Sequence, residues 1–298
     1  MPSLRQIRYF LGAADTGKVS AAAALLNISQ SSVTVAIQEL EAELGVTLFE
    51  RHAGGLRLTH EGQKFLPYAL NIEASVADAV KSMRQSASGI AGEVRLGTTA
   101  GPSGYLLFPI LERFRRSQPD IAIRVVECRR PDLQRMLLSG ELDLGLMLIS
   151  NLTDRSRYRT RCLLRSQRGL WLSSAHPLAR QKSISFADLR DEPYVMFELD
   201  EADQTLPMVW KKYGFSPNIV FTTGVPAAVR TFVATGGAVT ILSELLYRPW
   251  SLDGGRVEMR VLQEPIPTMD VGFVWKRRRE LSGAEVALCD YFAAACNS

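Results

Sequence analysis

The chain up to Gly45 places apolar residues at helical spacing in three segments separated by short breaks. Ser3 stands where a helix cap is expected before the first segment, and Gly17 ends that segment. An alanine-rich stretch that Ser20 can cap predicts a second, shorter helix through Leu26, because alanine is the best helix former. The third segment has one apolar face, which consists of Val33, Ile37, Leu40 and Leu44. The pattern therefore predicts three consecutive helices.

The break between the second and third segments consists of Asn27, Ile28 and Ser29. Asparagine tolerates left-handed turn geometry, and the serine can cap the helix that follows. Two short helices joined by such a turn are typical of a helix-turn-helix. An ordinary helical hairpin has the same spacing, so the outward face of the third helix must distinguish the two. That face carries short hydrogen-bonding side chains in place of the Lys and Glu of a solvent-exposed surface.

Side chains of this kind suit the base edges and phosphates of a DNA major groove. Two strand-like runs around a Gly-Gly turn follow the third helix and predict a β-hairpin wing, with two arginines beside it for phosphates. The residues that we assign to DNA contact are Ser29, Gln30, Ser31, Ser32, Thr34, Gln38, Arg51 and Arg57. The sequence thus predicts an N-terminal, all-α winged helix-turn-helix over residues 1–60.

The order of these motifs resembles the DNA-binding domain of LysR-type transcriptional regulators. The family pattern runs AA-x-x-L-x-x-S-Q, then I-x-x-LE-x-x-LG-x-x-LF-x-R, then LT-x-x-G. This sequence supplies it at Ala22, Ala23, Leu26, Ser29, Gln30, Ile37, Leu40, Glu41, Leu44, Gly45, Leu48, Phe49, Arg51, Leu58, Thr59 and Gly62. It departs at Ser31, where the family usually has Pro, and at residues 34–36, where Thr-Val-Ala replaces Ser-Arg-Gln. The resemblance implies a sequence-specific regulator of double-stranded operator DNA, with one expected arginine contact missing.

The charge of the N-terminal region constrains how it would bind DNA. Residues 1–66 carry six Lys or Arg and six Asp or Glu, a difference of zero, although the whole chain carries +4. Bulk attraction to DNA is therefore small, and affinity must come from placed contacts repeated over several subunits. We expect a modest salt dependence of DNA binding per subunit.

Residues 61–90 contain no turn signal before residue 85 except Pro67, and they predict a long helix that Thr59 caps and the proline kinks. Beyond the proline, an apolar seam can pack on the chain's own core or pair with a second copy. The family resemblance favours an antiparallel dimerisation helix and a homotetramer of two dimers. The seam consists of Leu70, Ile72, Val76, Val80 and Met83. The small residues of 85–92 predict the domain boundary.

From Glu93 onward, strand-like runs alternate with helical segments, which predicts an α/β region with a largely parallel sheet. Strands are expected at 94–98, 121–127, 142–149, 169–173, 194–197, 219–222, 238–242, 257–261 and 270–275. Helices are expected at 104–116, 131–140, 186–190, 204–213, 225–235, 243–248 and 282–295.

The family resemblance implies that residues 91–298 form an effector-binding regulatory domain. It implies two subdomains like those of periplasmic binding proteins, with the chain crossing between them near residues 161 and 267. Subdomain I would span about 91–161 and 268–298, and subdomain II about 162–267.

Ligands of open α/β sheets bind beyond the carboxyl ends of the strands, where helix N-termini offer free N–H groups. Polar residues follow several predicted strands and would suit a small polar or anionic effector, with Arg130 as its charge partner. Each threonine can equally cap a helix, and Arg130 can equally be a surface residue. The candidate effector-binding residues are Thr98, Thr99, Ser103, Arg130, Phe197, Thr223 and Gly224.

Composition and motifs exclude several other classes of protein. No apolar run approaches the ~18–20 residues of a membrane span, and the N-terminus has no secretory core, so we expect a cytoplasmic protein. The cysteines form no CxxC pair and the histidines give no zinc-ligand spacing, so we expect neither a metal nor a cofactor. A redox role for Cys128 or Cys162 stays an alternative to simple packing. Nucleotide-binding and hydrolase motifs are missing, and His176 has no carboxylate neighbour in sequence, which argues against an enzyme.

Two arginine-rich stretches, 155–168 and 276–279, can be nucleic-acid patches, but charge runs are usually solvated. We interpret the first as the wet face of a strand or loop and the second as a loop. Together the patterns favour a ligand-responsive transcription factor that resembles the LysR family. The resemblance also implies a mechanism in which effector binding closes one subdomain on the other and changes how two dimers pack on DNA. The alternative is an α/β solute-binding or enzymatic protein whose helical N-terminus mediates protein contacts only.

Overall fold

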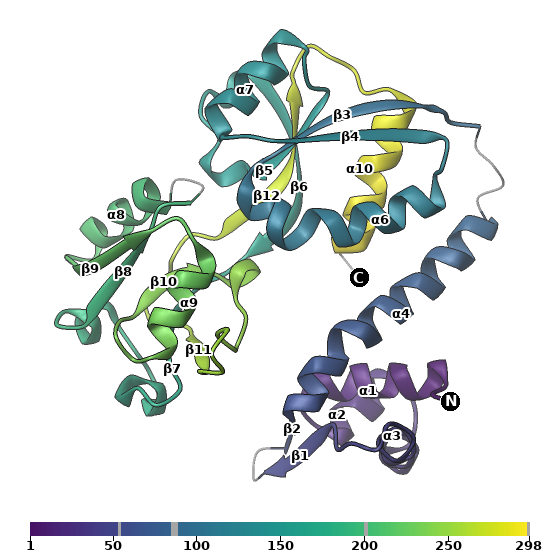
Figure 1. Ribbon diagram of the computed structural model, residues 1–298, viewed down its shortest axis with the longest axis vertical. Coiled ribbons are helices and arrows are strands. Elements are labelled where there is room, and N and C mark those ends of the chain that lie inside the picture. The colour runs from purple at the N-terminus through teal and green to yellow at the C-terminus, as the bar shows by residue number, and fades with distance from the viewer. Residues whose placement is uncertain (53–54, 85–88, 200–201, 297–298) are drawn as a thin grey trace. The chain divides into compact units, whose positions relative to one another are not determined.

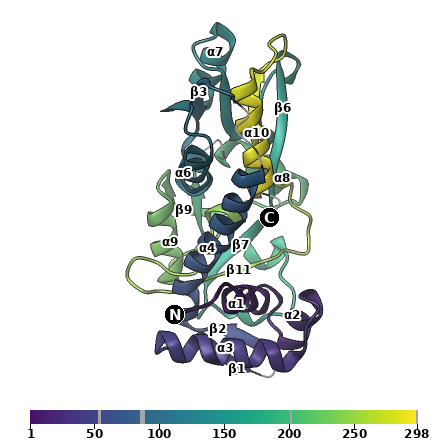
Figure 2. The same cartoon turned by 90° about the vertical axis from the view of Figure 1, so that its right-hand side faces the viewer.

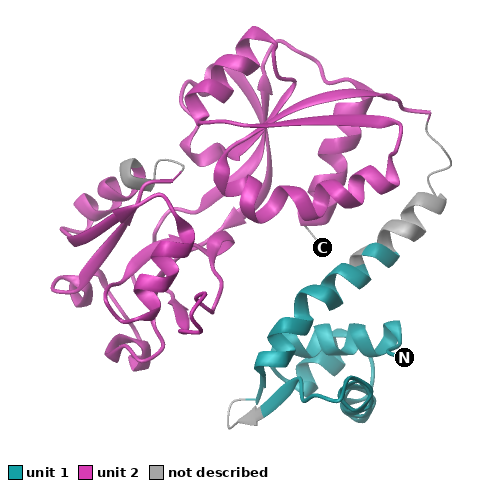
Figure 3. Cartoon of the chain, in the orientation of Figure 1, with its two compact units in different colours: residues 1–88 teal, residues 89–298 magenta. Residues whose placement is uncertain are grey.

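The computed structural model describes residues 1–52, 55–84, 89–199 and 202–296. The chain forms two compact units, Met1–Ser88 and Gly89–Ser298, whose elements are labelled in Figures 1 and 2 and which Figure 3 distinguishes by colour. Each unit has its own hydrophobic core. Within the described residues, no single helix combines the length and the apolar composition needed to cross a membrane.

The N-terminal unit is a group of helices with a β-hairpin attached (Figure 1). Phe10 is fully buried, and its ring centroid lies 5.3 Å from that of Phe49 and 5.1 Å from that of Phe65. These contacts join the first helix to both the hairpin and the long helix. The elements are α1 (Leu4–Thr16), α2 (Val19–Leu25), α3 (Gln30–Leu44), β1 (Phe49–His52), β2 (Gly55–Leu58) and α4 (His60–Arg84).

The local signals for helix ends are confirmed at α1 and α3. Ser3 caps α1 in a reciprocal box with Gln6, in which each side chain accepts a hydrogen bond from the other's backbone N–H. Ser29 caps α3 by accepting a hydrogen bond from the Ser32 N–H. Asn27 adopts a positive φ of 53°, the left-handed turn geometry that the sequence predicts there.

The start of α2 differs from the prediction. This helix begins at Val19 with Lys18 at the cap position, so the assignment of Ser20 as its cap is wrong. Gly17 reverses the chain in the left-handed conformation with φ 65°. Because this reversal needs so few residues, Ser20 already lies inside the first turn of α2.

The long helix α4 starts where the sequence predicts. Thr59 Oγ1 accepts a hydrogen bond of 3.0 Å from the Gly62 N–H and so caps the first turn. The helix continues through Pro67 to Arg84. The proline therefore does not end the helix, and the kink stays a prediction.

The C-terminal unit consists of two α/β lobes that the chain connects twice (Figure 1). The first lobe is a five-stranded sheet in the order β4-β3-β5-β12-β6, with α6 and α10 packed on one face and α7 on the other. Its elements are β3 (Gly92–Thr98), α5 (Ala100–Pro102), the π-helical turn η1 (Ser103–Leu107), α6 (Phe108–Ser117), β4 (Ile121–Glu127), α7 (Arg130–Ser139), β5 (Leu144–Leu148), η2 (Ile149–Asn151), η3 (Arg155–Arg157), β6 (Tyr158–Ser166), β12 (Met269–Lys276) and α10 (Gly283–Cys296).

The second lobe contains a three-stranded sheet in the order β10-β7-β11 and the pair β8-β9. Helix α8 covers one hydrophobic cluster of this lobe, and α9 covers another. Its elements are β7 (Arg168–Ser173), η4 (Pro177–Arg180), η5 (Phe186–Leu189), β8 (Pro193–Phe197), α8 (Ala202–Lys212), β9 (Asn218–Thr223), α9 (Pro226–Ala234), β10 (Thr240–Ser243), η7 (Glu244–Leu246) and β11 (Val257–Arg260).

The sheets are mixed, but most strands of each lobe run the same way, as the sequence predicts, because only one strand in each is reversed. β3 pairs in parallel with β4 and β5, and β8 pairs in parallel with β9. β12 runs antiparallel to β5 and β6, and β7 runs antiparallel to β10 and β11. The reversed strands, β7 and β12, are the first that the chain forms after each crossing between the lobes. The expected helices at 186–190 and 243–248 are only the 3₁₀ turns η5 and η7.

The arginine-rich stretch forms η3 and the edge strand β6, in agreement with the strand half of its interpretation. Arg159 is exposed, and Arg161 lies 2.6 Å from Asp290 of α10. β6 pairs with β12 as far as Ser166, so the expected crossing near residue 161 falls inside a strand. The chain leaves the first lobe only after Ser166, and it is back by Met269, where β12 begins.

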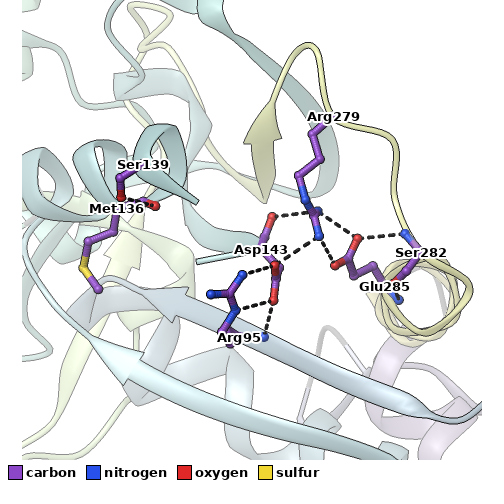
Figure 4. Close-up of polar contacts among 7 residues, drawn as sticks. All are labelled: Arg95, Met136, Ser139, Asp143, Arg279, Ser282 and Glu285. Carbon is purple, nitrogen blue, oxygen red and sulfur yellow. Dashed lines mark hydrogen bonds and ion pairs between the residues drawn. The ribbon is translucent and has the colours of Figure 1, made fainter. Parts of the chain in front are cut away.

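A network of four charged side chains joins distant parts of the first lobe (Figure 4). Arg95 donates two side-chain hydrogen bonds to Asp143, of 3.0 and 2.7 Å. Arg279 reaches the same carboxylate at 3.0 Å and also Glu285 of α10 at 2.9 Å. Ser282 donates its N–H to Glu285 at 2.9 Å. Arg279 of the basic run 276–279 is therefore a structural residue and not a solvated loop charge.

Candidate nucleic-acid interface and ligand site

Helices α2 and α3 cross at 109°, within the range of a helix-turn-helix. Val33 and Leu40 of α3 are fully buried and pack in the same core as Phe10 of α1. The hydrophobic contacts of the first three helices thus fix one side of α3 and leave the opposite side outward.

The outward side of α3 carries the residues predicted for DNA contact. Ser29, Gln30, Ser31, Ser32 and Gln38 are exposed. Thr34 is half-buried, and its hydroxyl donates a 3.0 Å hydrogen bond to the Gln30 carbonyl. The Ser29 hydroxyl lies 2.8 Å from the hydroxyls of both Ser31 and Ser32. The structure therefore gathers six of the eight predicted residues on the N-terminal half and outer side of one helix.

The wing is attached to α3 through Glu41. Its Oε1 accepts hydrogen bonds from the N–H groups of Leu48, at 2.6 Å, and Phe49, at 3.1 Å. These bonds tie the start of β1 to the end of α3. They give a physical reason for a glutamate at this position of the sequence motif, because no apolar side chain could accept them.

The glycine at position 62 of the sequence motif also has a physical reason. A Cβ atom at this position would lie 2.1 Å from the backbone oxygen of Leu48, which is far inside contact distance. The adjoining Thr59 donates its hydroxyl to the Thr47 carbonyl at 2.6 Å. The first turn of α4 can therefore approach the wing only with glycine at position 62.

The structure describes the side chain of only one of the two arginines predicted beside the wing. Arg57 is exposed on β2, directly opposite Glu50 in the hairpin register. The side chain of Arg51 lies outside the described residues. A phosphate contact by either arginine stays a prediction.

Val35 is a candidate contact residue that our sequence interpretation missed. It is 50% exposed and lies in α3 between Ser31 and Gln38, one turn from each. An exposed apolar side chain in this position can pack against a thymine methyl group, which only the major groove presents. The signal was available in the sequence, because Val33 and Ile37 point inward and a helix turns 100° per residue.

Part of the predicted seam on α4 is exposed. Leu70 is 53% and Ile72 is 37% exposed, and Val76 is half-buried. The structure does not describe the side chains of Val80 and Met83. Tyr68, 60% exposed, extends this apolar surface toward the start of the helix.

The first lobe places Thr98, Thr99 and Ser103 together at the carboxyl end of β3, and all three are buried. The Thr98 hydroxyl donates to the Thr99 carbonyl at 3.2 Å. Thr99 occupies the cap position of α5, but its side chain makes no capping hydrogen bond. Its Oγ1 atom is buried without a hydrogen-bond partner, as is the Ser150 hydroxyl at the carboxyl end of the neighbouring β5. Sequence reasoning missed Ser150, because nothing local to it predicts burial.

Arg130 begins α7 and is half-buried. Its Nη1 donates to Gln134 Oε1 at 3.3 Å and to Thr153 Oγ1 at 3.4 Å. Neutral groups of the first lobe therefore already accept hydrogen bonds from this guanidinium.

The second lobe brings Phe197 and Thr223 opposite each other in the β8–β9 pairing. Phe197 is only 3% exposed and belongs to the cluster under α9. The Thr223 hydroxyl accepts a 3.1 Å hydrogen bond from the N–H of Val225, which is itself the cap residue of α9, so Thr223 stabilises the turn before this helix and does not cap it. Gly224 is exposed.

The two lobes meet at Tyr105 of η1. This first-lobe residue packs against the second-lobe cluster under α9. The Arg248 guanidinium lies over its ring, 5.3 Å from the centroid. Burial lowers the pKa of Arg248.

Arg168 is a buried charge that the sequence did not indicate. It is 7% exposed at the start of β7, and its Nη2 donates a 3.2 Å hydrogen bond to Thr205 Oγ1 of α8. Burial lowers the pKa of this guanidinium. Because Arg168 ends an arginine-rich stretch, the sequence pattern predicted that it lies on the surface.

The two cysteines considered for a redox role differ in exposure. Burial raises the pKa of the Cys128 thiol, which disfavours the reactive thiolate. Cys162 is exposed on β6, and its thiol lies 3.8 Å from the Leu164 carbonyl. Cys128 is half-buried, and its raised pKa argues against a redox function at that residue.

Two family models match the chain. The model described as "LysR substrate binding domain" matches residues 87–297, and the model "Bacterial regulatory helix-turn-helix protein, lysR family" matches residues 4–63. The chain is 28% identical over 286 residues to the uncharacterized HTH-type transcriptional regulator YnfL of Escherichia coli, covering 94% of each chain. It is 28% identical over 266 residues to XapR of the same organism, covering 89% of each.

A solved structure extends the similarity over the whole length of the chain. HinK, a LysR family transcriptional regulator from Pseudomonas aeruginosa, is similar with a TM-score of 0.66 at 25% identity, covering 99% of both chains. The matching models and relatives are transcription regulators and not enzymes. These findings exclude the alternative of an enzymatic protein.

Proposed function

Because the chain belongs to the LysR family of DNA-binding transcriptional regulators with an effector-binding domain, we propose that α3 reads base edges of an operator in the major groove. The observation that supports this most strongly is the asymmetry of α3. One side is buried and tied to the wing through Glu41, and the other presents short polar side chains to solvent. A rigidly held polar face is what base recognition requires, since its donors and acceptors must be in place before binding.

We propose that α4 pairs two copies of the chain. Leu70, Ile72 and Tyr68 expose apolar surface on one long helix, which a second copy of that helix would cover. The pair would present two α3 helices to half-sites about 34 Å apart, one turn of DNA, or a multiple of that distance. Two such dimers would form the homotetramer.

We propose that a small effector, polar or anionic, binds between the two lobes of the C-terminal unit. Thr99 supports this site, because its buried hydroxyl has no hydrogen-bond partner among the residues that the structure describes. Ser103 and Arg130 from the first lobe and Thr223 and Gly224 from the second are proposed contacts, with Thr98 and Phe197 packed behind them. Since the protein must meet chromosomal DNA, we place it in the cytoplasm.

The proposed mechanism is a shift between two arrangements of the lobes. An effector can move this equilibrium only by binding one arrangement more tightly than the other. Closure of the lobes would change the packing of two dimers and with it the spacing or bending of bound DNA. Equal DNA footprints with and without a verified effector would contradict the mechanism.

Measuring operator binding by variants of α3 tests the proposal that this helix reads base edges. Genomic footprinting with the wild-type protein first identifies bound fragments. Gln30→Ala and Thr34→Ala should each weaken binding to these fragments by about 5- to 150-fold, the equivalent of about 1–3 kcal/mol per base contact. Circular dichroism and sedimentation should show unchanged folding and assembly.

The matched control is Gln181→Ala, which removes an exposed glutamine from the C-terminal unit. It should bind the same fragments as tightly as the wild type. Wild-type affinity in both α3 variants would refute the proposed role of this face.

A further inference from the structure

Three charged side chains are buried among the described residues: Asp143, Glu285 and Arg168. The two carboxylates lie within hydrogen-bond distance of Arg279, and Asp143 also binds Arg95. Arg168 differs, because in the described part of the chain it has no acidic side chain within ion-pair distance. A buried charge is normally paired, since burial removes the water that would otherwise solvate it.

Strand pairing fixes the place of Arg168. It lies opposite Ser243, the last residue of β10, in the antiparallel β7–β10 register. A parallel bridge joins Tyr194 of β8 to Val239, so β8 and β10 point the same way. Arg168 therefore lies at the edge of the second lobe where β8 ends and polar ligands of such sheets bind.

The same edge faces the junction with the first lobe. Arg168 is separated by one residue from Ser166, where β6 leaves the first sheet, and the Ser166 hydroxyl lies 2.6 Å from that of Ser243. β6 ends at the edge of the first sheet where β3 and β5 also end. The partnerless hydroxyls of Thr99 and Ser150 lie at that edge.

We propose that Arg168 binds the anionic group of the effector, and that this group is a single carboxylate. The proposal rests on the proposed function, since it assigns the ligand chemistry of the same site. A guanidinium with no counter-ion among the described side chains matches one negative charge, whereas a phosphate dianion would leave a second charge unpaired. Planar carboxylates also fit the fork of N–H donors that arginine presents.

Arg168 replaces Arg130 in this role. Gln134 and Thr153 already accept hydrogen bonds from Arg130, and that residue is only half-buried. Arg168 has lost most of its hydration, and burial lowers the pKa of its guanidinium, which arginine nevertheless keeps charged in proteins. Few water molecules therefore compete with an incoming carboxylate for the Arg168 guanidinium.

Thermal unfolding of the full-length protein tests the assignment, with sodium acetate as the probe and ionic strength held constant with a second salt. Acetate carries the proposed group and little else, so its fit does not depend on the rest of the effector. Saturating acetate should raise the melting temperature of the wild type by about 2–4 °C. Arg168→Met should lose this shift and, without acetate, melt no lower than the wild type, because it removes an unpaired buried charge. Arg168→Lys, which keeps the charge but not the fork, should keep a smaller shift.

Arg165→Met is the matched control, since it removes an exposed arginine of β6 and should respond to acetate like the wild type. A melting temperature of Arg168→Met well below that of the wild type without acetate would overturn the proposal in favour of a structural arginine. Equal acetate shifts in wild type and Arg168→Met, or none in either, would also overturn it. If inorganic phosphate raised the melting temperature and acetate did not, the assignment of the anionic group as a carboxylate would be refuted.

Operator binding without effector separates this result from the proposed function. Arg168→Met should bind the genomic fragments as the wild type does. If Arg168→Met loses the acetate response and still binds DNA, the carboxylate assignment is supported and the DNA-binding proposal is unaffected. Absence of DNA binding in the wild type, in turn, leaves the acetate result standing as a property of the C-terminal unit.

Discussion

Asp143 lies between two guanidinium groups, with Arg95 at 2.7 Å and Arg279 at 3.0 Å from its Oδ1. Burial by itself would raise the pKa of this carboxyl group, but the hydrogen bonds from Arg95 and the charges of both arginines outweigh burial and lower it. The folded protein therefore takes up a proton here at lower pH than the unfolded chain does. The stabilisation is complete above the ordinary value of 3.8 and is lost as the pH falls through the folded-state pKa.

Asp143→Asn should lower the free energy of unfolding at pH 7 by about 1–3 kcal/mol, because three charge-assisted hydrogen bonds from Arg95 and Arg279 lose their acceptor charge. The variant should also lose part of the stability decrease that the wild type shows below about pH 4. Urea unfolding at neutral and acidic pH measures both effects.

The control is Glu112→Gln, which breaks an exposed pair with Arg115. It should change the free energy of unfolding by less than about 1 kcal/mol. If Asp143→Asn were as stable as the wild type at pH 7, the network would not hold the first lobe together as we argue.

Side chains whose roles depend on neighbours in sequence could be predicted, and others could not. Ser29 and Gln30 follow a turn and begin an amphipathic helix, so their exposure follows from the local pattern. Arg168 is buried because β10 pairs with it and α8 contributes Thr205, both far along the chain. No sequence pattern around Arg168 contains that information.

The helices and strands of the N-terminal unit follow local signals more closely than those of the C-terminal unit. Caps and left-handed glycines locate the ends of α1 and α3. β6 and the antiparallel direction of β12 depend on which strands pair after the chain has crossed between lobes. Periodicity detects a strand, but it does not give the direction of its partner.

The exposed seam of α4 makes a prediction about assembly. Ile72→Glu should weaken dimerisation at least tenfold, because Ile72 lies one helical turn from both Tyr68 and Val76 on one side of α4 and the change would bury an unpaired carboxylate between two helices. Sedimentation over a dilution series measures the change, and circular dichroism checks that α4 stays folded. Asn71→Glu is the matched control, since it adds the same charge at an exposed position of the same helix. Identical assembly of the two variants would contradict pairing through this seam.

DNA recognition and effector binding belong to separate compact units of the whole molecule. An effector in the C-terminal unit therefore acts on α3 only through contacts between units or subunits. Couplings of this kind are typically about 1–3 kcal/mol, or about 5- to 150-fold in affinity. The balanced charge of residues 1–66 fits this arrangement, because weak individual contacts make DNA binding depend on how several subunits are spaced.

Selection of duplexes from a random library tests most directly whether the polar face of α3 reads base edges. The wild type should enrich a two-fold symmetric sequence. Gln30→Ala and Val35→Ser should each lose the preference at one or two base pairs of every half-site and keep the half-site spacing. Enrichment of the same bases by the wild type and both variants, or of no sequence at all, would contradict the account.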